Sequence, residues 1–382
     1  MSSRQQSFPL QPDWTSLGSD LTEHIFSFLP IRSLIRSSSV CKLWNTLISD
    51  EFFSTRFSAS KKPWFFLFGL NNVYFKNNQS FAYDPESNEW IQLSSSLFPT
   101  PYQNDESSSF MGASGYFFAS STPSRFSYTR ILNPAWRDTS PLRFSRFNPL
   151  VGVYNDKCGA SRFIVVGGVR FIGGLVDIED RLAVEIYSPR LDNWELCPPL
   201  PADFRYGNSS QWLSSALFKD KFYVFGINSF SVSSFDMNKH CWSDVQTLRP
   251  PGVMFSFLMT VGDSLVLAGL CNSPQRGPSF VLWNVDENSL EFSEVAIMPH
   301  ELLYGLFEND EDEKFASLKC VGLGNLIYVF NEEYHRNYPA CVCEFDGKSK
   351  ACSWKRVPQL PFHVNRFHKV VSFCSPVPLQ IA

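Results

Sequence analysis

Long apolar runs are missing from this 382-residue sequence. No stretch approaches the 18 or so consecutive apolar residues that a membrane-spanning helix requires. The first residues, MSSRQQSFPLQPDW, also lack the apolar core of a secretory signal peptide. We therefore expect an intracellular protein, in the cytoplasm, the nucleus or both, that has no membrane partner.

An excess of charge of one sign is missing as well. The chain has 33 Lys and Arg against 37 Asp and Glu, a net charge of −4, which gives no general reason to expect a nucleic-acid partner. Its ten cysteines are scattered from Cys41 to Cys374 without the spacing of a disulfide framework. In an intracellular protein they stay reduced, and we expect them to be small buried hydrophobic residues.

Motifs for catalysis or metal binding are not apparent. The sequence has no G-x-S-x-G elbow, no Walker loop and no G-x-G-x-x-G. The six histidines are mostly isolated along the chain, whereas a copper oxidase would need clustered His and Tyr ligands. Cys341 and Cys343 put two thiols on one side of a strand, but no second pair with zinc spacing follows. We expect no enzyme, no catalytic residue, no metal ligand and no cofactor.

The sequence does contain a repeat of short strands and turns from residue 63 onward. Clear copies are SFAYDPESNEWIQL (80–93) and CEFDGKSKACSWKRVPQLP (343–361). The aromatic residues that mark the copies lie 46, 58, 48, 50 and 62 residues apart: Trp90, Trp136, Trp194, Trp242, Phe292 and Trp354. A repeat near 50 residues made of strands is typical of propeller blades, and we expect six blades of four strands.

The order of strands within a copy predicts how the ring closes. Residues 213–245 read as four strands in sequence, whereas the first copy begins at PWFFLFGL, which corresponds to a second strand. The segment FHKVVSFCS (367–375) is left over at the other end of the chain. We expect it to supply the missing first strand and so remove an exposed sheet edge. The repeat resembles the kelch family, whose Gly-Gly pair is plain here only at Gly167 and Gly168.

Loop lengths predict which face of the propeller binds a partner. Turns between first and second strands are tight, whereas the long connections, 94–109, 167–182, 307–315 and 331–340, all emerge on the opposite face. Long loops on a rigid scaffold are a common place for binding. Three aromatic residues in them are candidate anchors for a target protein: Phe171, Tyr334 and Tyr338. Packing against a neighbouring blade is the alternative. The acidic run 308–313 could recognise a basic target or could simply be solvated.

The N-terminal part has a helical pattern instead. Asp20 and Glu23 have the spacing of a capping box. A helical stripe that ends at Pro30 is formed by Leu21, Ile25, Phe28 and Leu29. Further helices are expected over 31–36 and 40–49. Three helices in about 40 residues make a domain that is only marginally stable alone, so a partner is expected to cover part of its apolar surface.

These residues resemble an F-box, whose pattern runs from an L-P-x-D-L opening through L-P to V-C-K-x-W. The chain matches it at Leu17, Asp20, Leu21, Ile25, Leu29, Pro30, Leu34, Val40, Cys41, Lys42 and Trp44, and departs from it at Gly18, where the family usually has Pro. The resemblance implies docking of a Skp-type adaptor through Leu17, Leu21, Ile25, Pro30, Ile31 and Leu34. Val40 and Trp44 could equally be internal core.

The expected organisation is a small all-α three-helix F-box followed by an all-β kelch-like propeller. We place a disordered tail at 1–12, the F-box at 13–57, a linker at 58–62, the propeller at 63–375 and a C-terminal tail at 376–382. The resemblance implies the substrate-recognition subunit of a Skp-cullin-F-box ubiquitin ligase, which binds the adaptor, through it a cullin, and a target protein. The alternative is a binding scaffold that acts without ubiquitylation.

Overall fold

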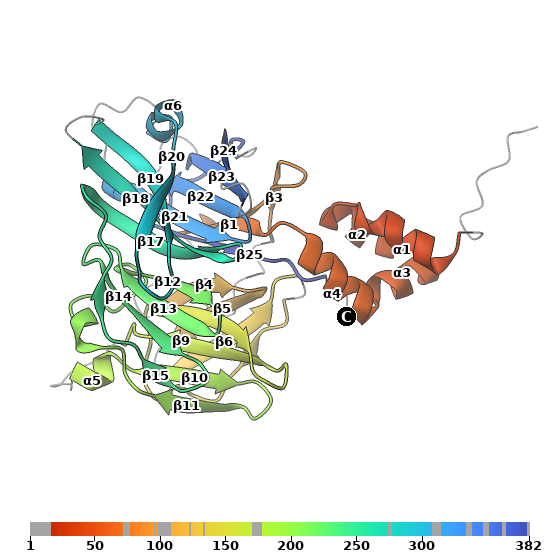
Figure 1. Cartoon of the computed structure of the whole chain (residues 1–382). Coiled ribbons are helices and arrows are strands. Elements are labelled where there is room, and N and C mark those ends of the chain that lie inside the picture. The colour runs from red at the N-terminus through yellow and green to blue at the C-terminus, as the bar shows by residue number, and fades with distance from the viewer. Residues whose placement is uncertain are drawn as a thin grey trace, which may run out of the picture. The chain divides into compact units, whose positions relative to one another are not determined.

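The computed structural model describes residues 17–71, 77–94, 97, 108–121, 124–132, 134–169, 178–273, 277–307, 315–333, 338–346, 351–360 and 364–379. The chain forms two compact units. One comprises Met1–Lys61 together with Pro378–Ala382, and the other comprises Lys62–Val377. The first unit is helical and the second is built almost entirely of strands (Figure 1).

The helical unit contains four described helices: α1 (Ser19–Ser27), α2 (Ile31–Ser38), α3 (Lys42–Ser49) and α4 (Glu51–Ser60). The fourth was not expected. It begins because Asp50 adopts an extended backbone and its side chain accepts the backbone N–H of Phe53 at 3.0 Å, as a helix N-cap does. Helix α4 therefore continues over residues 58–60, where the sequence suggested a linker.

The start of α1 differs from the capping box that the sequence suggested. The residue at the N-cap is Gly18, and no side chain caps the helix there. Asp20 lies inside the first turn, where its negative charge interacts favourably with the positive end of the helix dipole. Glu23 instead forms an ion pair with Arg56 of α4, at 3.2 Å. The carboxylate thus links two helices rather than capping one.

The last described residue joins the helical unit. The backbone N–H of Leu379 donates to Ser58 Oγ at 3.0 Å, and the Leu379 side chain is fully buried. Residues 376–382 were expected to be a tail only. The unit is therefore assembled from both ends of the chain, and the polypeptide passes between the two units twice.

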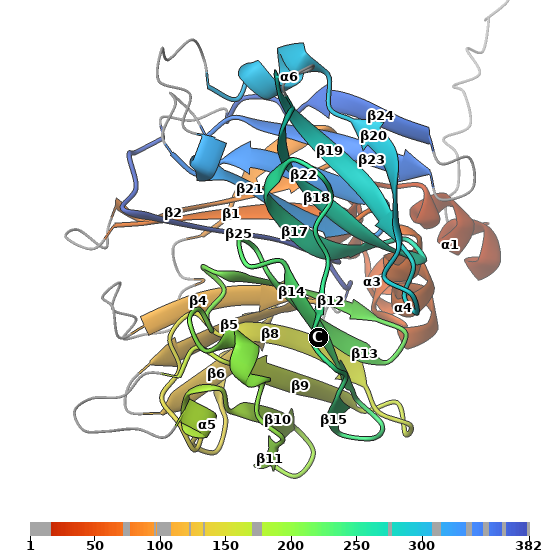
Figure 2. The same cartoon turned by 60° about the vertical axis from the view of Figure 1, so that its left-hand side comes forward.

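The second unit is a six-bladed propeller, as expected from the repeat (Figures 1 and 2). We number the blades along the chain, and each is an antiparallel sheet whose strand order follows the chain except in blade 1. Blades 1 to 3 consist of β25 (Lys369–Ser375), β1 (Trp64–Leu70), β2 (Gln79–Asp84) and β3 (Glu89–Gln92); β4 (Ser108–Ala113), β5 (Tyr116–Ser121), β6 (Arg125–Arg130) and β7 (Arg137–Asp138); and β8 (Leu150–Asn155), β9 (Ser161–Val166), β10 (Val184–Ser188) and β11 (Asn193–Cys197).

Blades 4 to 6 have the same plan. They consist of β12 (Leu213–Phe218), β13 (Lys221–Gly226), β14 (Ser231–Asp236) and β15 (Cys241–Trp242), with β16 (Gln246–Thr247) also paired to β14; β17 (Val253–Val261), β18 (Ser264–Ser273), β19 (Gly277–Val285) and β20 (Phe292–Ile297); and β21 (Leu318–Leu323), β22 (Leu326–Asn331), β23 (Ala340–Asp346) and β24 (Ala351–Arg356). Two short helices, α5 (Ile178–Arg181) and α6 (His300–Tyr304), lie in connections.

The marker tryptophans bind each blade to the one before it. The indole N–H of Trp90 donates to Pro358 O of blade 6 at 2.7 Å, and that of Trp136 donates to Leu97 O, just after blade 1, at 2.9 Å. Trp194 and Trp242 make the equivalent bonds to the carbonyls that follow blades 2 and 3, at 2.8 and 3.0 Å. The repeated Trp thus makes the same kind of hydrogen bond at four of the six seams.

The remaining two seams lack this bond among the described residues. Phe292 has no N–H to donate, and Trp354 Nε1 is buried with no hydrogen-bond partner in the part of the chain that is described. Extended apolar clusters span these seams instead: one joins blades 4 and 5, and the other joins blades 5 and 6. The strands of blade 5 are correspondingly long, because β17, β18 and β19 have 9, 10 and 9 residues.

The ring closes as the sequence predicted. Strand β25 pairs antiparallel with β1, from Trp64↔Ser375 to Leu70↔Lys369. Phe373 of β25 stacks on Phe66, with ring centroids 5.2 Å apart, and lies 6.0 Å from Phe117 of blade 2. A Cβ added to Gly112 of β4 would overlap the Phe373 ring, so the glycine makes room for it. The last strand therefore closes blade 1 and also packs against blade 2.

The cysteines are all free, and five of them are buried as expected: Cys197, Cys271, Cys320, Cys341 and Cys343. Cys41, Cys158 and Cys241 are exposed, because they lie in turns or at element ends rather than in the middle of a strand. Cys41 is the N-cap of α3, and its sulfur accepts the backbone N–H of Trp44.

The contact between Gly112 and Phe373 gives a test of closure. Phe373→Ala should lower the free energy of unfolding of the propeller by about 3–5 kcal/mol because it leaves a cavity. Gly112→Ala should cost about 1–3 kcal/mol through overpacking, but much less in the Phe373→Ala background, where the ring is gone. Urea unfolding followed by tryptophan fluorescence measures all four proteins. Additive effects of the two substitutions would contradict the contact.

Candidate protein-interaction surfaces

The helical unit exposes an unusual amount of apolar side chain for its size. Seven large apolar residues of the described part are exposed: Leu21, Ile25, Phe28, Ile35, Val40, Leu43 and Phe52. Phe28 and Val40 are the extremes within helices α1 to α3 and their turns, with 72% and 64% of their surface accessible. Because an excess of large exposed apolar side chains marks interaction sites, we treat these residues together as candidates for docking and call them the F-box surface.

Helix α1 shows how a short sequence creates this surface. Its inner face carries Thr22 and Phe26, which are buried, and Phe26 packs edge-to-face on Trp44 of α3 at 5.2 Å. Leu21, Ile25 and the C-cap residue Phe28 follow the spacing of a neighbouring stripe, about 100° around the helix from the buried one, and are exposed. The helix thus has one apolar face for its own domain and a second that its own domain leaves uncovered.

The six residues assigned to the adaptor surface divide into three groups. Leu21 and Ile25 are exposed, and Leu17 and Pro30 are partly buried. Ile31 and Leu34, which were expected at or near the docking surface, are buried almost completely within the helical unit, so their side chains are not part of its exposed face. Both sit on the inward stripe of α2, which periodicity alone could not distinguish from an outward one.

The two residues left open by the sequence also separate. Val40 is exposed and is not part of the core, whereas Trp44 is partly buried against Phe26. Phe28, Leu43 and Phe52 were not assigned to the surface. Their exposure follows from their position in the turn after α1, on the outer side of α3 and on α4, and it requires the helix packing to be known.

On the propeller, one of the three candidate aromatic anchors, Tyr338, is among the described residues. Phe171, Tyr334 and the acidic run 308–313 lie outside the described residues. Tyr338 is described, and it is buried. Its ring stacks on Phe367 with centroids 5.3 Å apart, and its hydroxyl accepts the backbone N–H of Phe367 at 2.8 Å. Tyr338 therefore packs between blades and positions the segment before β25; it does not face solvent.

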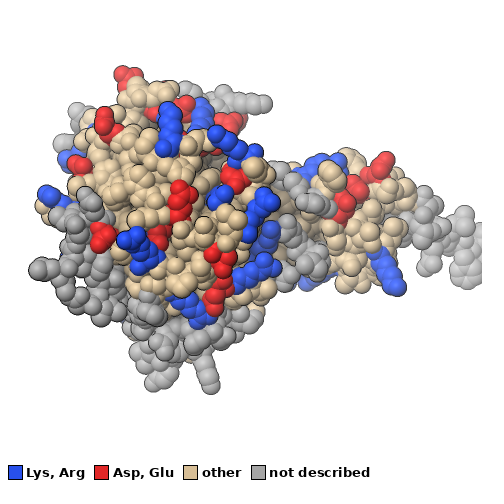
Figure 3. All heavy atoms as spheres, turned by 90° about the horizontal axis from the view of Figure 1, so that it is seen from below, with Lys and Arg blue, Asp and Glu red and all other residues tan. Residues whose placement is uncertain are grey.

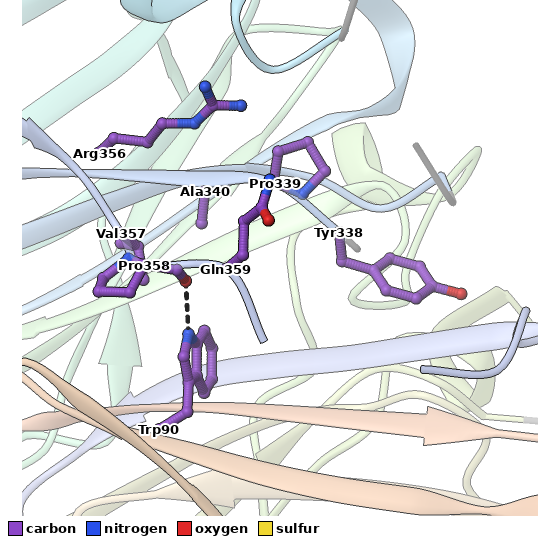
Figure 4. Close-up of a pocket in the computed structure, with 8 residues that line it drawn as sticks. All are labelled: Trp90, Tyr338, Pro339, Ala340, Arg356, Val357, Pro358 and Gln359. Carbon is purple, nitrogen blue, oxygen red and sulfur yellow. Dashed lines mark hydrogen bonds between the residues drawn. The ribbon is translucent and has the colours of Figure 1, made fainter. Parts of the chain in front are cut away.

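A small cavity lies beside Tyr338, at the seam of blades 6 and 1 (Figure 4). It is bounded by Trp90, Arg356 and the backbone around Pro358, and the bond from Trp90 Nε1 to Pro358 O crosses its floor. Its volume of about 10 Å³ has room for about one water molecule. This space is too small to be a binding site for an organic ligand, for which several hundred Å³ are usual.

Other side chains are exposed on the long-loop face, where the sequence analysis did not identify them. Tyr206 and Trp212, in the connection from β11 to β12, are 87% and 54% accessible, and Met254 at the start of β17 is 53% accessible. Arg205 lies beside Tyr206, with its guanidinium 4.7 Å from the centre of the Tyr206 ring. We call Arg205, Tyr206, Trp212 and Met254 the blade 4–5 patch.

The backbone that carries this patch is well anchored. Ile227 N–H donates to Trp212 O at 2.9 Å, and Ser256 N–H donates to Ile227 O at 3.1 Å, which joins the entrances of blades 4 and 5. A Cβ added to Gly207 would lie 2.7 Å from Trp212 Cβ, so the glycine lets the tryptophan fold over the loop. The sequence does show two aromatic residues in a Gly-, Asn- and Ser-rich loop. It does not show that their side chains are exposed to solvent.

Charges of both signs are present on the propeller surface (Figure 3). On the propeller face drawn in Figure 3, acidic and basic side chains are interspersed. A mixed face of this kind gives no broad field of one sign, which a nucleic-acid site would need. No described helix combines the length and the apolar character needed to cross a membrane.

Comparison with known proteins defines the class. Residues 14–59 match the F-box-like family, so the chain carries an F-box-like domain followed by a six-bladed kelch-like propeller. The sequence-based resemblance to F-box/kelch-repeat proteins is thereby confirmed. An F-box/kelch-repeat protein of Arabidopsis thaliana is 29% identical over 379 residues, covering 95% of this chain and 90% of the relative.

Two further relatives from Arabidopsis thaliana are more distant. F-box only protein 13 is 22% identical and spans 90% of this chain and 80% of its own length. The protein UNUSUAL FLORAL ORGANS is 23% identical, with 83% of this chain and 74% of the relative covered. Similarity to F-box proteins therefore extends over the propeller and is not limited to the helical part.

The division of the F-box residues into core and surface is testable by stability. Leu34→Ala should lower the free energy of unfolding of the helical unit by about 2–5 kcal/mol, because the side chain is buried. Leu21→Ala should change it by less than about 1 kcal/mol, because the side chain is exposed. Circular dichroism at the helix band during urea titration reports on this unit selectively. Equal losses in the two variants would contradict the assignment.

Proposed function

We propose that this protein is the substrate-recognition subunit of a Skp-cullin-F-box ubiquitin ligase. The observation that carries the proposal is the F-box surface: a unit that matches the F-box-like family leaves seven large apolar side chains exposed. Covering such side chains with a partner releases about 25 cal/mol for each Å² of apolar area removed from water. A Skp-type adaptor is the partner that the family match supports, and a cullin would follow through the adaptor.

In this role the protein performs no covalent chemistry of its own. It holds a target near a ubiquitin-loaded enzyme and raises the effective concentration of the target's lysines. The propeller suits the task because its seams are fixed by indole hydrogen bonds and by ring closure, so loops on it are presented from a rigid body. Such a complex would act in the cytoplasm or the nucleus.

The target is proposed to bind at the blade 4–5 patch. Tyr and Trp are favoured at the centres of interfaces, and Tyr206 and Trp212 are both exposed on one well-anchored loop. Arg205 adds a cation beside the Tyr206 ring, and Arg249 lies exposed on the next connection of the same face. The matching partner is a protein segment that presents apolar side chains together with a carboxylate. Phe171 and Tyr334 stay candidates for target binding in other long loops of the propeller.

A scaffold that acts without ubiquitylation is the second possibility. It would use the same two surfaces, so binding alone does not distinguish it from a ligase subunit. The distinction is made by reconstitution with adaptor, cullin and ubiquitin-loading enzymes: a ligase subunit lengthens its bound target by ubiquitin, whereas a scaffold leaves the target unmodified.

Adaptor binding is tested with single substitutions on the F-box surface. Ile25→Asp and Val40→Asp should each weaken binding of a purified Skp-type adaptor at least 30-fold, since a charge would replace an apolar contact worth about 2 kcal/mol or more. Leu191→Asp is the matched control, because Leu191 is an exposed apolar residue of the propeller. Calorimetric titration gives the affinities. An adaptor that binds all four proteins equally would exclude this surface.

Target binding is tested on the other unit. Tyr206→Ala combined with Trp212→Ala should release the target and keep the adaptor bound, because the two surfaces are on different units. Leu191→Ala combined with Leu196→Ala, which removes two other exposed apolar side chains of the propeller, should keep both partners. Quantitative mass spectrometry of affinity-purified complexes is the measurement. A protein retained at equal level by every variant is not held by the patch.

A further inference from the structure

The seam between blades 3 and 4 brings together three potential metal ligands. Glu195 and Cys197 lie on β11, and His240 lies in the turn between β14 and β15. One ligand atom of each residue lies within 4.8 Å of the other two. His240 Nδ1 lies 3.1 Å from Glu195 Oε1. No sequence motif predicts this cluster, because the histidine follows the other two residues by more than 40 positions.

Regular structure holds the two ligands of blade 3 on one side. Glu195 and Cys197 occupy alternate positions of β11, so their side chains point to the same face of the sheet. Both are fixed by pairing with β10, as Ile186↔Glu195 and Val184↔Cys197. Cys197 is buried, and its thiol has a weak contact, to Glu195 O at 3.9 Å. Such a contact leaves the sulfur available for a stronger interaction.

His240 is held in place from the other blade. Its backbone has a φ of 52°, and its N–H donates to Asp236 O at 2.8 Å, which fixes the turn. Two residues further on, Trp242 Nε1 donates to Pro198 O at 3.0 Å, directly after Cys197. This bond sets the distance between β11 and the turn that carries His240, so the three ligands are brought together by the same seam contact that repeats around the ring.

The surroundings permit a cation. The nearby basic side chain of Arg162 is paired with Asp156 at 3.1 Å, and Lys239 points toward Asp236 at 4.0 Å. The Glu195 and His240 side chains are partly exposed, which gives an ion a route from solvent and lets the carboxylate adjust. One sulfur, one imidazole nitrogen and one carboxylate oxygen form a donor set that suits zinc and does not suit magnesium or calcium, which prefer oxygen alone.

We propose that Glu195, Cys197 and His240 bind a zinc ion that links blade 3 to blade 4, with a water molecule as the fourth ligand. In a tetrahedral zinc site the ligand atoms lie about 3.5 Å apart, so any two ligand atoms here whose separation approaches the 4.8 Å limit must come closer together. Rotation of the exposed Glu195 side chain and a small shift of the His240 ring supply this contraction. Binding replaces the thiol proton of Cys197, which leaves to solvent as the Zn–S bond forms.

The test uses the full chain, freed of metal by a chelator and titrated with Co²⁺ as a spectroscopic substitute for zinc. The expected result is one Co²⁺ per chain, with the sulfur-to-cobalt charge-transfer band that a thiolate ligand produces. Cys197→Ser should abolish that band. Cys241→Ser is the matched control, because Cys241 is an exposed thiol next to His240 and should leave the band unchanged.

Two surface variants keep the proposal falsifiable if Cys197→Ser disturbs the core. His240→Gln and Glu195→Gln change partly exposed residues, and each should weaken zinc binding at least tenfold, measured by competition with a chelating dye. Zinc should also raise the unfolding temperature of the unmodified chain and not that of His240→Gln. The proposal is overturned if stoichiometric Co²⁺ gives no thiolate band, if the band is lost in Cys241→Ser, or if His240→Gln binds zinc as tightly as the unmodified chain.

Discussion

The hydrogen bond between an outer-strand tryptophan and the chain that leaves the previous blade is the interaction on which the propeller depends. A four-stranded blade buries its faces only against its neighbours, so each seam must be held at a fixed separation. The indole does this in two ways, because its ring contributes apolar surface to the seam and its N–H donates a hydrogen bond to a backbone carbonyl of the preceding blade's outgoing chain. Trp90, Trp136, Trp194 and Trp242 repeat the arrangement.

Where the indole bond is missing, apolar packing supplies the cohesion. Blade 5 has the longest strands, and the seams on both of its sides are filled by large apolar clusters. Ring closure completes the assembly, since β25 joins the last part of the chain to the first blade and Phe373 reaches into the next. Rigidity is therefore distributed around the ring, and the connections between blades are free to differ in length and exposure. The blade 4–5 patch is one product of that freedom.

The helical unit, unlike the propeller, leaves part of its apolar surface uncovered. Four short helices cannot bury all of their apolar residues, even with Leu379 added from the far end of the chain. Helix α1 uses one stripe for its own core and leaves the other uncovered, so the domain is built as one part of an interface. The two units thus divide the work: one provides an apolar surface for a partner, and the other provides a rigid support for loops.

The sequence by itself determined the architecture. Tryptophans about 50 residues apart predict blades, a first copy that lacks its first strand predicts closure by the last strand, and the V-C-K-x-W pattern identifies the helical domain. These features are local or periodic, so they can be recognised in the sequence alone. The tertiary structure alone decided which residues face outward. Periodicity places Ile31 and Leu34 on a stripe and Tyr338 in a loop, but only the packing of neighbouring helices and blades buries them. The same holds for Glu195, Cys197 and His240, which become neighbours because a seam contact joins strands that are distant in sequence.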